Sequence, residues 1–331
     1  MQYAIILLIS LFPITLLSQN CDSLLLGSIT NPGPYSVNDI DESSGIRNGS
    51  DYSGSTIYYP INSNGNYASI VLVPGYMNTE STIQNWGPFL ASHGIVTMTI
   101  GTNSLTDTHI QRKDALLDAI ISLKNENNRF ASPLYTKLDT TTIAVGGFSK
   151  GGGGAQLAAV DVPELKAIVA LYPWLDNPSQ SELNHNIPVI IVSGQLDLIA
   201  PPSSHADVHY DYTPNTTNKL KYEVEFASHD AFSGPNGGNG EVGKRVFSWL
   251  QTYLLDDSCY CPLMLVPATT SSEYITNIVC DNINQVSEFS YTNKKLIKVI
   301  DLLGRETKGN KKTPLFYIYD DGTVEKKIII E

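Results

Sequence analysis

Residues 139–160 read DTTTIAVGGFSKGGGGAQLAAV, which indicates a strand, a sharp turn and a helix in direct succession. The run from Thr140 to Val145 is largely β-branched, as is typical of strands. Small residues and Leu157 follow the turn and are compatible with a closely packed helix. We therefore expect the fold to be organised around this strand-turn-helix unit.

The turn itself contains a Gly-x-Ser-x-Gly motif, formed by Gly147, Ser149 and Gly151. This spacing is that of a nucleophile elbow, in which a strained turn exposes the serine hydroxyl at the start of a helix. The two glycines occupy positions where a Cβ atom would collide in the tight turn. A plain glycine-rich βα turn or a phosphate loop is the alternative, but a phosphate loop requires a Gly-Lys-Ser/Thr ending that is missing here.

The same alternation of strands and helices extends over most of the chain. Expected strands cover 55–59, 67–73, 95–100, 140–145, 167–172, 188–193 and 220–226, and expected helices cover 81–92, 111–125 and 241–255. Such alternation predicts an α/β fold with a doubly wound, mostly parallel sheet. Ligands of such sheets bind beyond the carboxyl ends of the strands.

Three chemically complementary side chains follow three of these strands. Ser149, Asp197 and His229 each come just after the end of a separate strand. A serine needs a base to become nucleophilic, and a histidine base needs a carboxylate to orient its ring. The chain order Ser, Asp, His is that of α/β-hydrolases. We therefore expect these three residues to be catalytic.

Other residues compete for the same roles. Asp176 follows the strand after the elbow, and Asp230 adjoins His229, but Asp197 in Gly-Gln-Leu-Asp is preferred as the acid. A strand-end aspartate can also simply cap a loop. Among the other histidines, one is expected to cap a helix and four to be solvated surface residues: His93, and His109, His185, His205 and His209.

An oxyanion hole requires two backbone N–H groups near the nucleophile. One is expected from Lys150, the residue after the serine, and the other from Tyr76 in the loop after strand 67–73.

Composition and charge limit the compartment and the partners. The chain has 331 residues and a formal net charge of −12. Positive and negative charges nearly balance in residues 281–331, so the excess of negative charge lies in residues 1–280. An acidic body argues against nucleic acid as a partner. The apolar N-terminal run ends at Ser18-Gln19 and is interrupted by Pro13, which indicates a secretory signal peptide over residues 1–18. We expect an exported or surface-located protein, monomeric and with no membrane span after cleavage.

Four cysteines lie outside the expected catalytic core: Cys21, Cys259, Cys261 and Cys280. In an exported protein they are expected to form disulfides. Cys259 and Cys261 are poorly placed to pair with each other, so one of them is expected to reach Cys21 or Cys280. No metal site and no cofactor are expected, because ligand clusters at metal spacing are missing from the sequence.

Several short motifs in order resemble bacterial cutinases and PET-degrading polyester hydrolases over residues 30–255. They are Val73-Pro-Gly-Tyr76, Trp86-Gly-Pro88, Leu90-Ala-Ser-His-Gly94, Thr102-Asn-Ser104, the elbow, Pro173-Trp174, Asp197-Leu-Ile-Ala-Pro201 and Ser228-His229. The resemblance implies ester cleavage through an acyl-serine intermediate in an open cleft. It also implies that Tyr76 and Trp174 are aromatic walls of this cleft and Ile199 an apolar contact. One departure is Lys150, where the family usually has Met.

The tail has a resemblance of its own. Lys294 to Glu306 and Leu315 to Lys327 are similar to the C-terminal sorting domains of the Bacteroidetes type IX secretion system. This resemblance implies that the type IX secretion machinery is a partner of the protein. The expected organisation is a signal peptide (1–18), an α/β-hydrolase domain (19–261), a linker (262–280) and a small β domain (281–331).

The function expected from these observations is a secreted serine hydrolase of carboxylic esters or polyesters. One alternative is a lipase or acetylhydrolase acting on small or lipid esters. The other is an inactive hydrolase fold that serves as a surface adhesin.

Overall fold

The computed structural model describes residues 29–280 except 64 and 231–233, together with 296–301, 304–307, 315–319 and 324–327 of the tail. The chain divides into two compact units, residues 1–280 and 281–331. The expected signal peptide and Cys21 lie outside the described residues.

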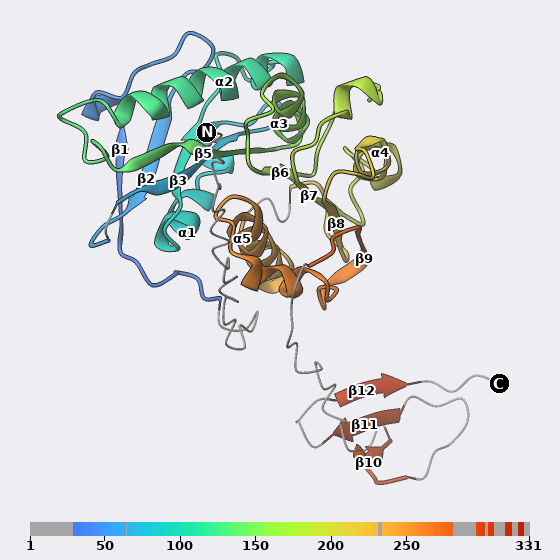
Figure 1. The fold of residues 1–331 in the computed structure, drawn as a ribbon. Coiled ribbons are helices and arrows are strands. Elements are labelled where there is room, and N and C mark those ends of the chain that lie inside the picture. Colours follow the sequence, from blue (N-terminus) through green and yellow to red (C-terminus); the bar gives the residue numbers. More distant parts are fainter. Residues whose placement is uncertain are drawn as a thin grey trace, which may run out of the picture. The chain divides into compact units, whose positions relative to one another are not determined.

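A nine-stranded sheet forms the centre of the first unit, in the order β1-β2-β4-β3-β5-β6-β7-β8-β9 (Figure 1). The pairs from β4 through β8 are parallel, whereas β1, β2 and β9 pair antiparallel at the two edges. The strands are β1 Val37–Asp41, β2 Ser55–Pro60, β3 Tyr67–Val73, β4 Val96–Ile100, β5 Leu138–Phe148, β6 Ile168–Leu171, β7 Val189–Gly194, β8 Lys219–Val224 and β9 Ser271–Thr276.

Helices cover both faces of this sheet. Helices α2, α3 and α4 lie on one face, and α1 and α5 lie on the other (Figure 1). Their bounds are α1 Trp86–Ser92, α2 His109–Glu126, α3 Lys150–Asp161, α4 Ala206–Tyr212 and α5 Glu241–Tyr253. The mostly parallel α/β fold expected from the sequence is therefore confirmed.

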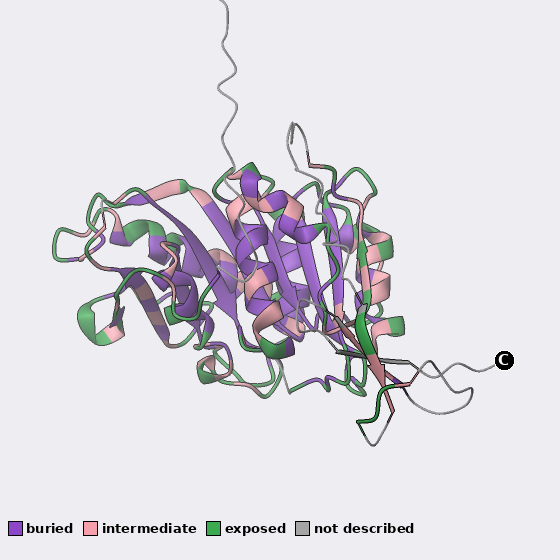
Figure 2. Cartoon of the chain, turned by 90° about the horizontal axis from the view of Figure 1, so that it is seen from below, coloured by how far each residue is buried: buried purple, intermediate pink, exposed green. Residues whose placement is uncertain are grey.

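Strand β3 shows why its sequence is apolar throughout. Ile70 and Leu72 pack into the core beneath α1 and α5, whereas Val71 and Val73 pack into the core beneath α2 and α3. Successive side chains of a strand point to opposite faces, so a strand covered on both faces buries every residue. Figure 2 shows the central strands as continuously buried.

The segment expected as a linker differs from that expectation. Residues 271–276 form β9, which pairs antiparallel with β8 and closes one edge of the sheet. Cys261 and Cys280 form a disulfide, one of the pairings left open by the sequence. Residues 262–280 are therefore part of the first unit. The polar composition of β9 reflects its edge position, where one face remains in water.

The second unit contains a three-stranded antiparallel sheet in the order β10-β11-β12. Its strands are β10 Leu296–Ile300, β11 Leu315–Tyr319 and β12 Val324–Lys327. Gly304 has a φ of 77°, a left-handed conformation that favours glycine. The small β domain expected at the C-terminus is present. Among the described residues, no helix is both long and apolar enough to cross a membrane.

Candidate active site

The turn between β5 and α3 places Ser149 in a strained backbone conformation. Its φ of 54° and ψ of −121° are unfavourable for a residue with a side chain. The flanking glycines permit this turn, because a Cβ on Gly147 would lie 2.5 Å from the Gly151 carbonyl carbon and oxygen. A Cβ on Gly151 would lie 2.4 Å from the Val73 carbonyl oxygen. Backbone contacts at this turn therefore require the Gly-x-Ser-x-Gly spacing.

The structure brings the three strand-end residues into one hydrogen-bonded row. Ser149 Oγ lies 3.0 Å from His229 Nε2, and Asp197 Oδ2 lies 2.6 Å from His229 Nδ1. All three side chains are buried, with 5%, 5% and 2% of Ser149, His229 and Asp197 exposed. This is the geometry in which a histidine can accept the serine proton while a carboxylate stabilises the resulting cation.

The second oxygen of Asp197 is also fixed. Asp197 Oδ1 accepts hydrogen bonds from the backbone N–H groups of Ile199 (2.9 Å) and Ala200 (2.7 Å). These two backbone donors hold the carboxylate in one orientation. Its competitor Asp176 makes its contacts elsewhere: its Oδ1 accepts a hydrogen bond from Trp174 Nε1 at 2.7 Å.

The loop after β3 lies directly against the nucleophile. A Cβ on Gly75 would come 2.8 Å from the Ser149 Cβ, so only glycine permits this approach. Tyr76 follows Gly75 in this loop, and Lys150 is the first residue of α3. The first N–H groups of a helix have no partner within it and are suited to binding an anion.

Arg112 of α2 fixes the loop after β3 by hydrogen bonds to its backbone. Its side chain is fully buried and donates to the carbonyl oxygens of Pro74 (2.9 Å), Gly75 (2.6 Å), Leu105 (3.3 Å) and Asp107. Burial lowers the pKa of its guanidinium to about 10, which leaves it cationic at neutral pH. This role could not be predicted from the sequence, where Arg112 is one polar residue of an expected amphipathic helix.

The residues expected to contact substrate lie in the loops after β3 (Tyr76), β6 (Trp174) and β7 (Ile199). Tyr76 and Ile199 are 46% and 53% exposed, as binding surfaces require. The backbone N–H of Trp174 donates to the Ser149 carbonyl at 2.9 Å, which ties the loop after β6 to the elbow. The Trp174 ring stacks on His205, with ring centroids 4.2 Å apart.

Lys150 lies beside the elbow with its charge directed at Asp176. Its Nζ is 3.6 Å from Asp176 Oδ2 and lies 5.0 Å from the centre of the Tyr76 ring. The pKa of the Asp176 carboxyl is lowered, first by the hydrogen bond from Trp174 and then by Lys150 and His109, against an opposing effect of burial.

The expectation for four of the histidines was wrong. His109, His185, His205 and His209 are all buried rather than solvated. Burial lowers the pKa of each, to about 4 for His185 and to about 3 for His209. The sequence misled because α4, which carries His209, is short and has a mostly polar sequence. This polar sequence does not indicate that one face of α4 packs on β7 and β8.

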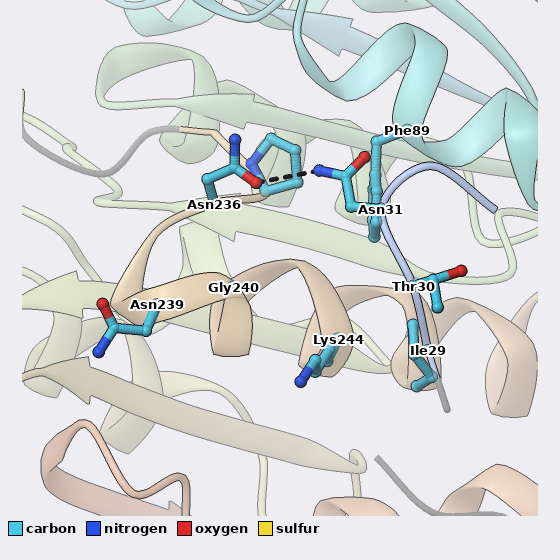
Figure 3. Close-up of a pocket in the computed structure, with 9 residues that line it drawn as sticks. Ile29, Thr30, Asn31, Phe89, Asn236, Asn239, Gly240 and Lys244 are labelled. Atoms are coloured by element: carbon cyan, nitrogen blue, oxygen red, sulfur yellow. Dashed lines mark hydrogen bonds between the residues drawn. The ribbon is translucent and has the colours of Figure 1, made fainter. Parts of the chain in front are cut away.

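Other sites are sparse in the part of the chain that is described. It contains no group of three or more His, Cys, Asp or Glu side chains that could hold a metal ion. A pocket of about 270 Å³ is shown in Figure 3, where Asn31 and Asn236 are joined by a hydrogen bond of 3.0 Å. Its lining comes from residues 29–31, 89, 235, 236, 239, 240 and 244 and includes none of Ser149, Asp197 and His229.

Comparisons with known proteins identify the family of this chain. A model of the PET hydrolase-like family matches residues 26–281. The chain is similar to Cutinase 1 of Thermobifida cellulosilytica, at 36% identity over 73% of this chain and 88% of that protein. It is also similar to a cutinase of Thermobifida fusca (strain YX), at 36% identity over 73% of this chain and 77% of that protein.

A third relative is named for a specific ester. The bis(hydroxyethyl) terephthalate hydrolase of Streptomyces coelicolor is 37% identical over 74% of this chain and 76% of its own length. The family match covers nearly all of the first structural unit, including the elbow and the two loops that carry Asp197 and His229. The chain therefore belongs to the PET hydrolase-like family.

Proposed function

We propose that this protein hydrolyses carboxylic esters through an acyl-serine intermediate on Ser149. Membership of a family with cutinases and a terephthalate-ester hydrolase makes it a carboxylic-ester hydrolase. The observation that carries the serine mechanism is the continuous row from Ser149 Oγ through His229 to Asp197, at 3.0 Å and 2.6 Å. The row is buried, so water does not compete for these hydrogen bonds.

In the acylation step, His229 Nε2 takes the proton from Ser149 Oγ as this oxygen attacks the ester carbonyl carbon. The negative charge that develops on the carbonyl oxygen is stabilised by the backbone N–H groups of Tyr76 and Lys150. Asp197 stabilises the imidazolium formed on His229. The tetrahedral species then collapses, and the alcohol leaves with the proton from His229.

Deacylation repeats these steps with water. His229 takes a proton from a water molecule, whose oxygen attacks the acyl carbonyl carbon, and Ser149 Oγ leaves and regains a proton from His229. The same two N–H groups stabilise the second oxyanion. Arg112 acts as a positioning residue in both steps, because it holds the carbonyl groups of Pro74 and Gly75 next to Tyr76.

A polyester is the substrate class that this site fits best. Tyr76, Trp174 and Ile199 would contact the acyl part of the chain, and the exposed positions of Tyr76 and Ile199 leave them accessible to an extended polymer. The relatives named for cutin and for a terephthalate ester support this class.

Export completes the proposal. The N-terminal apolar run would direct secretion and be removed after Ser18, and residues 281–331 would act as a type IX sorting domain at the cell surface. The mature enzyme would act extracellularly as a monomer. The match of the family to residues 26–281 leaves the tail outside the catalytic unit, as a removable sorting domain requires.

A substrate panel tests the proposed class. The purified protein is assayed on a short soluble ester, an emulsified long-chain triglyceride, bis(2-hydroxyethyl) terephthalate and polyester film, each with the Ser149→Ala variant as the blank. Turnover of the terephthalate ester and film that the variant lacks supports a polyester hydrolase. Turnover restricted to the triglyceride indicates a lipase, and turnover of none indicates an inactive fold.

A further inference from the structure

Lys150 and Asp176 connect the two aromatic residues expected to wall the cleft. Lys150 Nζ lies 5.0 Å from the centre of the Tyr76 ring, within the range of a cation–π contact. On its other side it lies 3.6 Å from Asp176 Oδ2. The other carboxylate oxygen of Asp176 accepts the indole N–H of Trp174 at 2.7 Å. A continuous row of contacts therefore runs from Tyr76 to Trp174 through one ion pair.

Trp174 is held at two points by this arrangement. Asp176 binds the nitrogen of its indole ring, while His205 stacks on the ring with an interplanar angle of 26°. The backbone of Trp174 is also bound to the Ser149 carbonyl. On this fixed backbone, the contacts to Asp176 and His205 orient the ring.

The ion pair is partly open to water. The side chains of Lys150 and Asp176 are 18% and 50% exposed. Contacts of this kind are individually weak and are screened by salt. A link between the walls made of such contacts can open when a wide substrate enters, and it can close again on a narrow one.

We propose that the Lys150–Asp176 pair is a clasp that sets the distance between Tyr76 and Trp174 and thereby restricts the width of the acyl group accepted. The proposal rests on the proposed ester hydrolysis at Ser149 and adds a specificity determinant to it. Neither residue of the clasp takes part in proton transfer. Their removal therefore changes the ratio of rates for wide and narrow acyl groups rather than abolishing turnover.

The first test compares kcat/KM for bis(2-hydroxyethyl) terephthalate and p-nitrophenyl acetate in Lys150→Met and Asp176→Asn. Both variants should raise the terephthalate-to-acetate ratio by about three- to fivefold, the effect of removing one exposed ion pair. The double variant should shift the ratio no further than either single variant, because both break one link. Salt should raise the ratio in the wild type and leave it unchanged in the variants.

The ion pair between Lys113 and Asp161 provides a matched control. Lys113 and Asp161 form an ion pair at 2.6 Å, with side chains 20% and 47% exposed. Lys113→Met removes a charge of the same sign and similar exposure but no contact with Tyr76 or Trp174, so the ratio should remain that of the wild type.

A second readout is independent of activity. The chain has three tryptophans, and Trp86 and Trp249 are only 1% and 0% exposed, so acrylamide quenching of fluorescence reports mainly on Trp174. Quenching should increase in Asp176→Asn and Lys150→Met, remain unchanged in Lys113→Met and be largely lost in Trp174→Phe.

The clasp is overturned if the rate ratio and the quenching of both clasp variants match the wild type, or if Lys113→Met changes the ratio equally. Such a result would leave ester hydrolysis intact. The proposed function fails separately, if Ser149→Ala retains turnover.

Discussion

The Asp197 carboxylate and the His229 imidazole lie 2.6 Å apart, with both carboxylate oxygens of Asp197 occupied. One oxygen faces His229 Nδ1, and the other accepts hydrogen bonds from two backbone N–H groups of the following turn. The carboxylate therefore has a single orientation, and so does the ring bound to it. In this arrangement the loop after β7 determines which nitrogen of His229 faces Ser149.

Asp197→Asn should lower kcat for soluble esters by about 10⁴-fold with little loss of stability, because an amide preserves the shape but favours the wrong tautomer of the histidine. Steady-state kinetics and a thermal melt together measure this. Asp176→Asn is the matched control, since Asp176 was the competing candidate for the acid. A loss of comparable size in the control, or nearly full activity in Asp197→Asn, would contradict the assignment.

Arg112→Lys should lower kcat by about 10²-fold, because a lysine cannot bind the carbonyl groups on both sides of the loop and a small displacement of a catalytic donor is costly. Arg245→Lys provides the comparison. Arg245 is equally buried, but it donates to Leu263 on the opposite face of the sheet. Both variants should be less stable, and only Arg112→Lys should be slow per folded molecule. Equal rates for the two variants would argue against a positioning role.

Replacing Cys261 and Cys280 with serine should lower the free energy of unfolding by about 3 kcal/mol, the loop-closure value for a disulfide of this span. The two cysteines are 19 residues apart and attach β9 to the rest of the first unit. Urea unfolding measures the loss, and kcat at 25 °C should be retained, because neither cysteine contacts the candidate site. An unchanged urea midpoint would show that the disulfide is not needed to hold this edge.

Stability should fall on mild acidification. The folded state keeps His185 and His209 neutral, with pKa values lowered by burial to about 4 and about 3, whereas the unfolded chain protonates them near pH 6.5. The unfolded state therefore binds more protons below pH 6.5, and the free energy of unfolding decreases as pH falls from 6.5 toward 4.

Urea unfolding at pH 7, 6 and 5 measures this dependence. The slope should flatten in His209→Gln, whatever the absolute stability of that variant, because one of the buried titrating groups is gone. A wild-type stability that does not change between pH 7 and pH 5 would contradict the burial of these histidines.

Much of the fold followed from local sequence patterns. Strand β3 was expected at residues 67–73 and is found there, because a strand buried on both faces needs an unbroken apolar run. The catalytic candidates could also be predicted from local patterns, because Ser149, Asp197 and His229 each follow the end of a strand. Parallel strands bring their carboxyl ends to one edge, so the topology converts three distant residues into neighbours.

Features that depend on tertiary packing could not be predicted from local sequence patterns. Arg112 and His209 are polar residues on helices, and only the tertiary structure shows that they are buried beneath the site and against the sheet. Strand β9 has a polar sequence that reads as a linker, and its pairing with β8 is a long-range contact. The contact of Lys150 with Asp176 joins residues from α3 and the loop after β6, whose side-chain directions a sequence does not specify.

The most direct test of the account is the covalent state of Ser149 during turnover. The wild type is reacted with a fluorophosphonate probe and, separately, quenched during hydrolysis of p-nitrophenyl acetate, and intact-mass and peptide mass spectrometry locate any adduct. We predict one adduct per chain, on Ser149, with Ser149→Ala unlabelled, folded and slower by at least about 10⁴-fold. Ester turnover retained by Ser149→Ala, or an adduct on another residue, would contradict the central claim.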